Sequence, residues 1–417
     1  MIFDRRYYID RLISKRKNGM VKIITGLRRA GKSFLLFDLY KKYLLKNGYD
    51  EAHIITINFD DLENIENRKV KNAYNLIKSK LVDKKEYVIL LDEIQFVDDF
   101  VPMLNSLLHI NNVDCYVTGS NSKFLSKDVV TEFRGRGDEI HLFPLTFKEL
   151  LPLYDNDRYK CFEDYLLYGG LPMVYVKNSE LDRTEYLKNI FSETYIIDIL
   201  ERYNIKKSEE LDNLLSIISS SIGSFTSIQN IVNTFKTKYN AKISIPTIKN
   251  YLEILKDIFL VREVEKYDIK GRKHIGAEKK YYYEDIGLRN ARIGFRQVDK
   301  SHIMENIIFN ELIKRRYEVD VGIIKKKEII NNMRKNRQYE VDFIVEQGHT
   351  KYYVQSAYEM NTEKKREQEY RSLKYVADSF KKIVIRYDNY GISLDENGIL
   401  NIGLFDFLLN EDCFSYE

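Results

Sequence analysis

The sequence lacks tryptophan and has only three cysteines among its 417 residues. Cys115, Cys161 and Cys413 lie far apart and form no metal-ligand spacing, and so sparse and odd a set indicates a reducing cytoplasm. No stretch approaches the roughly 18 apolar residues of a transmembrane helix, and the charged start at residues 1–6 has no apolar signal-peptide core. We therefore expect a cytoplasmic protein without a membrane segment.

The chain also lacks low-complexity segments, internal repeats and linkers rich in proline, glycine or serine. Its apolar content of 44% and charged content of 31% are typical of soluble globular proteins. A chain of 417 residues suffices for two or three domains with cores of their own. The net charge of +4 is too weak to indicate a partner, so the local distribution of charge matters more.

A glycine-containing loop with a lysine and a serine stands between an apolar run at 21–25 and a helical pattern at 34–40. It reads G-x-x-x-x-G-K-S, a pattern whose backbone N–H groups and following helix start hold phosphate. Lys32 would reach the β- and γ-phosphates of a nucleotide, and the Ser33 hydroxyl would bind Mg²⁺. The predicted nucleotide-binding residues are Gly26, Leu27, Arg28, Arg29, Ala30, Gly31, Lys32, Ser33 and Phe34.

Two carboxylates follow the apolar run at 87–91, which is typical of a strand buried on both faces of a parallel sheet. Ligands of open α/β sheets bind beyond the carboxyl ends of the strands. Asp92 would hold Mg²⁺ through water, and Glu93 would orient the attacking water. With the runs at 21–25, 54–58, 115–118 and 140–143, the pattern predicts an α/β core with a parallel sheet and helices on both faces.

A polar loop follows the run at 115–118, and a basic loop precedes the run at 140–143. Ser120 or Asn121 would sense the γ-phosphate or hold the attacking water, unless the loop 118–122 is only a set of turn formers. Arg134 or Arg136 would reach the γ-phosphate of a neighbouring subunit in trans, which requires a homo-oligomer, unless the loop is a solvated basic one. Beside the two preceding motifs we favour the sensor role for Ser120 or Asn121, and the alternative for the arginines stays open.

These motifs, with residues 5–12 upstream and the segment 142–150, resemble the prokaryotic AAA+-type ATPases of the archaeal-ATPase group that carry a C-terminal domain of unknown function. The resemblance covers essentially the whole chain and implies ATP and Mg²⁺ as ligands, with Tyr8 among the nucleotide contacts. The segment 168–172 is similar to a Gly-x-Pro element that senses nucleotide from a lid, so Pro172 would face the adenine or ribose; the alternative is a helix-breaking turn. We place the P-loop NTPase core at 1–144 and a helical lid at 145–207.

Three helical patterns followed by two short strands predict a winged helix at 208–298. Ser244 with Pro246 is a good start for the third helix, whose exposed face would carry Lys249 and Asn250. The basic segment 266–280 would be the wing. This arrangement suits DNA, but winged helices also serve as protein-interaction modules, so the partner stays open.

The segment 299–417 resembles the restriction-endonuclease-like α/β fold, whose metal site is Glu, then Asp, then Glu-x-Lys. Glu305 and Asp342 match the first two positions, but Gln355 and Ala357 replace the second acid and the lysine. Loss of these groups weakens a Mg²⁺ site and removes the cation beside the reacting phosphate, so we expect no nuclease activity. Residues 314–337 contain nine Lys or Arg and three acids, which suits either a phosphate backbone or a solvated face.

The sequence thus predicts a Mg²⁺-dependent ATPase in which Lys32 and Glu93 are catalytic, and which couples nucleotide state to DNA binding or remodelling. The alternative is a nucleotide-dependent switch that binds a protein partner and turns over slowly.

Overall fold

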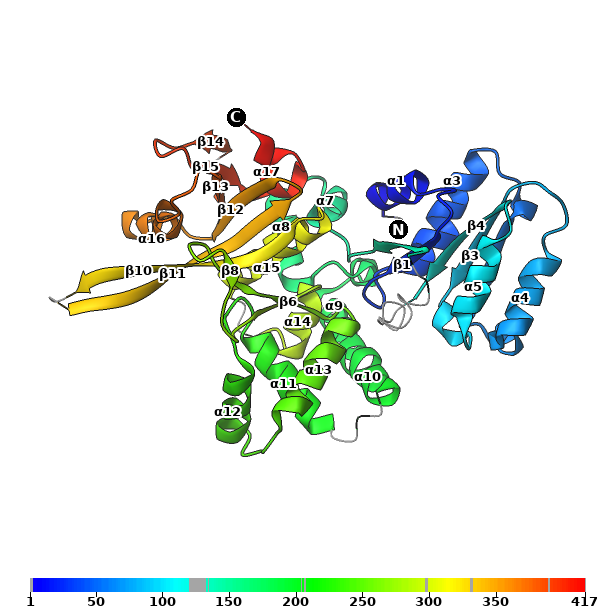
Figure 1. The fold of residues 1–417 in the computed structure, drawn as a ribbon, viewed down its shortest axis with the longest axis horizontal. Helices are drawn as coiled ribbons and strands as arrows, with labels where there is room; N and C mark the ends of the chain where they lie inside the picture. Colours follow the sequence, from blue (N-terminus) through cyan, green and yellow to red (C-terminus); the bar gives the residue numbers. More distant parts are fainter. Residues whose placement is uncertain are drawn as a thin grey trace. The chain divides into compact units, whose positions relative to one another are not determined.

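The computed structural model describes residues 3–119, 133, 135–203, 205, 208–296, 299–330, 333–388 and 391–416 (Figure 1). The chain divides into two compact units. The first contains residues 1–144 with 257–260, and the second contains residues 145–256 with 261–417. Among the described residues, no helix combines the length and apolar character that crossing a bilayer requires.

The first unit is built on five parallel strands: β1 (Val21–Thr25), β2 (Ile54–Asn58), β3 (Tyr87–Asp92), β4 (Val113–Thr118) and β5 (Gly137–His141). Their order is β2-β3-β4-β1-β5, and every neighbouring pair is parallel. The predicted parallel sheet is therefore confirmed. Since all strands run the same way, the loops after β1, β3 and β4 meet at one edge of the sheet.

Helices cover both faces of this sheet, as Figure 1 shows. Alternate strand residues such as Ile23 and Ile24 point to opposite faces and join separate apolar clusters. One face carries α4 (Val70–Ser79) and α5 (Phe100–Leu108). The other face carries α1 (Arg6–Ser14) and the continuous helix formed by α2 (Lys32–Phe34), the π-helical η1 (Leu35–Tyr40) and α3 (Lys41–Lys46). Short 3₁₀ turns complete the loops: η2 (Glu51–His53), η3 (Leu62–Asn64), η4 (Glu66–Arg68) and η5 (Ile94–Phe96).

The second unit begins with helices, as the sequence pattern predicts. They are α7 (Phe147–Leu150), η7 (Leu151–Tyr154), α8 (Arg158–Tyr168), η8 (Pro172–Val176), α9 (Glu180–Asn189), η9 (Ile190–Ile196) and α10 (Ile197–Arg202). Three further helices follow: α11 (Ser208–Ser220), α12 (Ile228–Lys238) and α13 (Ile245–Asp257). Ser244 starts α13 in the expected way, because its hydroxyl accepts a hydrogen bond from the N–H of Thr247 at 3.2 Å.

The strands β6 (Val261–Val264) and β9 (Lys280–Tyr283) pair antiparallel after these helices, and α14 (Ile286–Arg292) follows. The segment between them does not stand apart as the expected wing. Its strands β7 (Lys266–Asp268) and β8 (Lys273–His274) form a hairpin, and β7 pairs with β10 of the larger sheet. Sheet-edge pairing therefore replaces a free wing at 266–280.

The larger sheet has the order β14-β15-β13-β12-β11-β10-β7-β8. After α14, the chain continues with the remaining strands of this sheet and the helices between them. These elements are α15 (Lys300–Lys314), β10 (Glu318–Ile330), β11 (Met333–Gln347), β12 (Thr350–Ala357), α16 (Glu363–Lys374), β13 (Lys381–Arg386), β14 (Ile392–Leu394), β15 (Leu400–Gly403), α17 (Leu404–Leu409) and η10 (Cys413–Ser415). The strands β10 and β11 are much longer than their neighbours and form a hairpin whose outer part leaves the sheet (Figure 1).

Candidate nucleotide site

The phosphate loop lies at the carboxyl end of β1, and Lys32 opens the helix that follows it. Lys32 is 5% exposed, and its ammonium donates hydrogen bonds to the carbonyls of Gly26 and Leu27, both at 3.0 Å. Gly26 has φ of 130°, and a Cβ built there would lie 2.2 Å from the carbonyl oxygen of Leu142. Only glycine fits this position. The loop is thus held in a fixed shape around the lysine.

The other residues of the loop divide into anchors and accessible groups. Leu27 and Ala30 are buried in the unit, whereas Arg29, Ser33 and Phe34 are exposed. Arg28 is half-buried. The accessible residues therefore lie at the start of the helix, where backbone N–H groups and the helix dipole attract an anion.

Asp92 connects the phosphate loop with β3 and β4. It ends β3 and is 3% exposed, and its carboxylate accepts hydrogen bonds from the hydroxyls of Thr118 and Ser33. Burial raises the pKa of Asp92 above its ordinary value, although these two hydrogen bonds oppose the shift. Oxygen ligands of this kind suit Mg²⁺, so Ser33 and Asp92 together fit the ion that the sequence predicts.

Glu93 follows Asp92 in a left-handed backbone conformation with φ of 50°. Such a conformation is uncommon for a residue with a Cβ, and here the Glu93 N–H donates to the Thr118 hydroxyl oxygen at 3.1 Å. The half-buried Glu93 carboxylate accepts a hydrogen bond from the Gln95 amide. Thr118 thus fixes Asp92 through its proton and Glu93 through its lone pair.

Thr118 and Gln95 were not predicted as site residues. The sequence signal for Thr118 is a polar residue at the end of the fourth strand, whereas the sequence prediction assigns the sensor role to Ser120 or Asn121. Those two residues and Arg134 lie outside the described residues. Gln95 carried no distinguishing signal, since its importance depends on the turn that brings it back to Glu93.

Arg136 is exposed at the amino end of β5, where its carbonyl accepts a hydrogen bond from the N–H of Val21 at 2.9 Å. Its backbone is therefore separated from the phosphate loop by the whole of β1, roughly 15 Å. An arginine side chain does not span that length. A role for Arg136 at a nucleotide can only be in trans, which stays a prediction.

Tyr8 and Pro172 have structural surroundings of their own. Tyr8 is fully buried, and its hydroxyl accepts a hydrogen bond from the N–H of Phe143 at 3.1 Å. Pro172 starts η8 after a turn in which the Asp285 carboxylate accepts a hydrogen bond from the N–H of Gly170 at 2.7 Å. Nucleotide contacts by either residue remain predictions.

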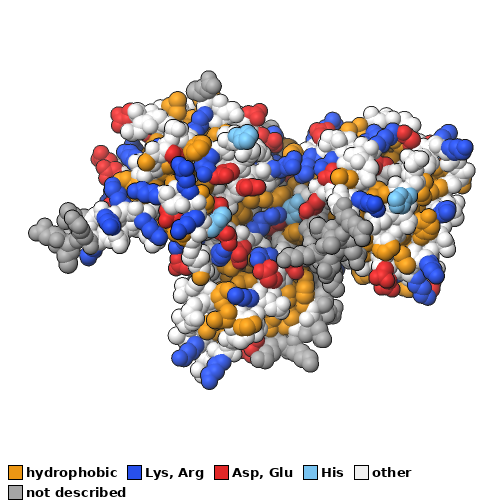
Figure 2. Space-filling model, in the orientation of Figure 1, with side chains coloured by type: hydrophobic (Ala, Val, Ile, Leu, Met, Phe, Trp, Pro, Cys, Tyr) orange, Lys and Arg blue, Asp and Glu red, His pale blue; other side chains and the backbone are white. Residues whose placement is uncertain are grey.

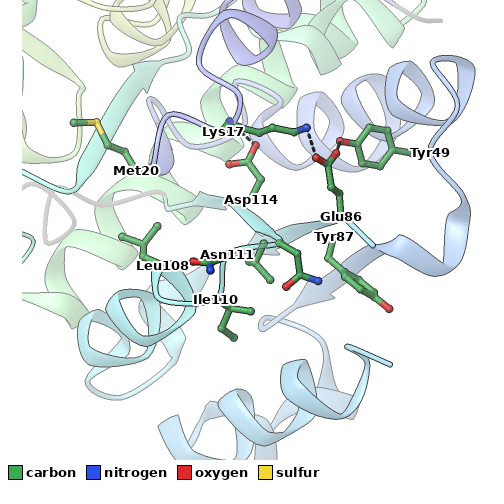
Figure 3. A pocket seen from close by; sticks show the side chains of 12 residues that line it. Lys17, Met20, Tyr49, Glu86, Tyr87, Leu108, Ile110, Asn111 and Asp114 are labelled. Carbon is green, nitrogen blue, oxygen red and sulfur yellow. Dashed lines mark hydrogen bonds and ion pairs between the residues drawn. The ribbon is translucent and has the colours of Figure 1, made fainter. Parts of the chain in front are cut away.

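A pocket of about 240 Å³ opens at the amino ends of β3 and β4, at the edge of the sheet opposite Asp92 (Figure 3). Its charged groups bond one another: the Lys17 ammonium pairs with Glu86, and the Lys17 N–H donates to Asp114 at 3.2 Å. The pocket therefore lies apart from the phosphate loop.

A second group of acids lies in the other unit, where the sequence predicts a degenerate metal site. Carboxylate oxygens of Glu305, Glu340 and Asp342 lie within 4.8 Å of one another. The Lys280 ammonium lies 2.8 Å from Glu305 Oε1 and 2.5 Å from Glu340 Oε1. Burial, and then the Glu305 carboxylate, raise the pKa of Asp342 well above its ordinary value, while Lys280 opposes the shift.

This cluster corrects one expectation. The sequence left only two acids and no lysine, but the structure adds Glu340 and supplies an ammonium from β9. Gln355, at the position expected for an acid, instead accepts a hydrogen bond from the Ser372 hydroxyl at 3.2 Å and donates to Glu369 at 3.2 Å. Ala357 is buried in the apolar core behind it. The sequence does not connect Lys280 with these acids, because the residue lies in a separate segment, in β9 before α15.

Three family models match the chain: an AAA domain at residues 18–151, a domain of unknown function (DUF8612) at 159–299 and a domain of unknown function (DUF4143) at 300–405. An uncharacterized protein of Haemophilus influenzae is 33% identical over 416 residues, which are 98% of this chain and 99% of the relative. The uncharacterized protein MJ1544 of Methanocaldococcus jannaschii is 32% identical over 83% of this chain and 77% of its own length.

Among solved structures, the Orc1 protein of Aeropyrum pernix in complex with DNA is similar over 70% of this chain and 92% of its own, with 16% identity and a TM-score of 0.30. Cdc6p of Pyrobaculum aerophilum matches over 73% of this chain and 94% of its own, with 12% identity and a TM-score of 0.29. Given its AAA domain and its full-length similarity to the Haemophilus protein, the chain belongs to this family of AAA-type ATPase-domain proteins with two C-terminal domains of unknown function.

Proposed function

We propose that the chain binds ATP with Mg²⁺ at the phosphate loop and hydrolyses it to ADP and phosphate. The observation that carries the proposal is the meeting of five residues at one edge of the sheet. The Ser33 hydroxyl and the Asp92 carboxylate are hydrogen-bonded to each other, Thr118 joins Asp92 to the backbone of Glu93, and Lys32 begins the same helix as Ser33.

Each group has a chemical task in this proposal. Lys32 exchanges its two carbonyl partners for the β- and γ-phosphates, and Ser33 with Asp92 holds Mg²⁺. Glu93 orients the water that attacks the γ-phosphate in line. Ser120 or Asn121 senses that phosphate, and Arg134 or Arg136 of a neighbouring subunit stabilises the charge that develops. Catalysis is then mostly positional and electrostatic.

Two substitutions test binding and hydrolysis separately. Lys32→Ala should abolish ATP binding measured by equilibrium titration, while Lys42→Ala, at an exposed position of the same helix, should leave it unchanged. Glu93→Gln should bind ATP normally and turn over at least ~100-fold more slowly, the scale expected of a positioned base. Parental affinity in Lys32→Ala, or parental turnover in Glu93→Gln, would remove the basis of the proposal.

We further propose that nucleotide state controls contact with DNA. This is supported by the basic hairpin of β10 and β11 in the second unit. The competing function is a slow switch that binds a protein partner. It is favoured by the turn before Pro172, which Asp285 ties through the N–H of Gly170 to the start of α14. Turnover that duplex DNA accelerates supports the first function, and turnover indifferent to DNA supports the second.

A further inference from the structure

The outer part of the hairpin β10–β11 carries no role in the nucleotide site. We propose that this ribbon, defined as residues 324–330 and 333–339, lies along duplex DNA and is the nucleic-acid contact of the chain. The inference deepens the proposed function, on which it rests only for the link to ATP.

The ribbon leaves the sheet because its strands are longer than their neighbours. In the structure as described, β7 pairs with β10 only at residues 321–323, and β12 pairs with β11 only from Phe343 onward. Beyond those points β10 and β11 pair with each other through seven further residue pairs, from Ile324↔Tyr339 to Ile330↔Met333. At about 3.4 Å per residue, the ribbon extends roughly 20 Å.

The ribbon is strongly basic. Its two strands contain six Lys or Arg residues and one carboxylate, Glu328. Figure 2 shows basic side chains gathered where the ribbon leaves the sheet. A charge of this density on a narrow two-stranded element matches the spacing of phosphates along a duplex better than it matches a protein surface of mixed charge.

The two faces of the ribbon differ. In the register of the hairpin, Lys325 lies opposite Gln338 and Lys327 lies opposite Asn336, so these four side chains share one face, and all four are exposed. We call them the amide face. It has cations for phosphates and amides for base edges, and it carries no acid among these four residues.

The opposite face is partly neutralised by its own contacts. Its single acid, Glu328, lies 3.7 Å from the Arg337 guanidinium and accepts a hydrogen bond from the Tyr339 hydroxyl at 2.5 Å. The Lys326 ammonium lies 3.5 Å from the centre of the Tyr375 ring. On this face Lys326 and Arg337 are engaged within the chain, and Lys335 is exposed. On the amide face the Lys325 ammonium lies 3.9 Å from the Asp268 carboxylate, but its side chain is 52% exposed, and Lys327 is exposed as well. The amide face, with both of these lysines accessible beside its amides, is therefore the better candidate for an external anion.

Basic residues continue beside the base of the ribbon. The N–H of Ile269 donates to the carbonyl of Ile323 at 3.1 Å, which places the turn after β7 next to the point where β10 leaves the sheet. Lys270 and Arg272 in that turn and Lys273 at the start of β8 are exposed. The cations that the sequence assigned to a wing thus extend the ribbon surface.

Duplex DNA is the partner that this surface fits. The major groove admits a two-stranded β-ribbon, and Lys, Asn and Gln are side chains that contact phosphates and base edges there. A membrane surface would require apolar side chains beside the cations, and the amide face offers polar ones. An RNA duplex has a deep, narrow major groove that excludes such a ribbon.

The test measures binding of the full chain to a fluorescent DNA duplex of about 30 base pairs. Fluorescence anisotropy reports the affinity, and no nucleotide is added. Each phosphate contact contributes about 0.9 to the slope of log affinity against log salt concentration. The double variant Lys325→Gln with Lys327→Gln should therefore bind at least ~10-fold more weakly and lower that slope by about 2. The control Lys42→Gln with Lys46→Gln removes the same charge from exposed positions of α3 and should bind like the parent.

A second control addresses the opposite face. Lys326→Gln with Arg337→Gln should weaken binding less than the amide-face variant does. Parental affinity and slope in the amide-face variant would overturn the proposal, as would equal losses in all three double variants. The proposal would also be overturned if the parent chain bound phosphatidylserine vesicles, or an RNA duplex of the same length, more tightly than it binds DNA. Lys32→Ala separates the two proposals, because its DNA binding should persist even when ATP binding is lost.

Discussion

The buried ammonium of Lys280 gives the sharpest energetic prediction. Its side chain is 2% exposed and lies between Glu305, which is 9% exposed, and Glu340, which is 35% exposed. Burial lowers the pKa of Lys280, but the carboxylates of Glu305, Glu340 and Asp342 outweigh burial and raise it above its ordinary value. The charge is therefore retained in the folded state. Lys280→Met keeps most of the volume and removes that charge.

The loss should be large because the acids are left without their cation. Removing one partner of a buried ion pair costs about 3–5 kcal/mol of unfolding free energy. At about 2–4 °C per kcal/mol for a domain of some 150–250 residues, the midpoint of thermal unfolding should fall by roughly 6–20 °C. The control Lys300→Met breaks an exposed pair with Glu163, at 2.7 Å and 41% and 48% exposure, and should cost less than about 1 kcal/mol.

The dependence on pH provides a second readout. Burial already raises the pKa of Asp342 well above its ordinary value and the Lys280 ammonium opposes that shift, so removal of the ammonium should raise the pKa of Asp342 further. The folded variant then binds more protons than its unfolded chain, so its stability rises as the pH falls. The difference between parent and Lys280→Met should therefore shrink from pH 8 toward pH 5, as measured by thermal melts. A deficit below about 1 kcal/mol, or one independent of pH, would refute this reasoning.

Three further predictions concern the nucleotide site and the acid cluster. Thr118→Val should leave ATP affinity within a few-fold of the parent but lower kcat by about 10- to 100-fold and raise the Mg²⁺ requirement, while Thr118→Ser restores both; an unchanged kcat would remove Thr118 from the site. Arg136→Ala should lower turnover and spare nucleotide affinity, and parental activity per subunit should rise with protein concentration; a monomer whose activity is independent of concentration contradicts an arginine in trans. Supercoiled, linear and single-stranded DNA should stay intact in Mg²⁺ or Mn²⁺, since the Lys280 ammonium already pairs with Glu305 and Glu340, where a metal ion would bind; cleavage that Asp342→Ala abolishes would show an active nuclease.

The sheet of the first unit was predictable because its strands are short apolar runs that end in polar loops. Residues 87–91 read as a strand buried on both faces, and β3 is buried along its whole length. The positions of Lys32, Ser33 and Asp92 then follow from the rule that parallel strands present their carboxyl ends together. These positions were predictable because each strand and each loop is formed by residues that are neighbours in the sequence.

What the sequence could not give are contacts that depend on strand order. Thr118 touches Asp92 and Glu93 because β4 lies beside β3, which no local pattern states. Lys280 reaches Glu305 and Glu340 because β9 returns beside α15 and β11. The wing expected at 266–280 was not predictable as a sheet-edge hairpin for the same reason. Its strand β7 pairs with β10, which lies far away in the sequence.

The ribbon of β10 and β11 has a consequence for solubility. Along its seven outer pairs each strand has one edge that no other described strand covers, so N–H and C=O groups are available to a further strand. Such edges promote edge-to-edge association between copies, and charged side chains, lysine above all, are a common protection against it. The six lysines and arginines of the ribbon are therefore expected to oppose association of the ribbon edges of neighbouring copies, and their replacement by neutral residues is expected to make such association easier.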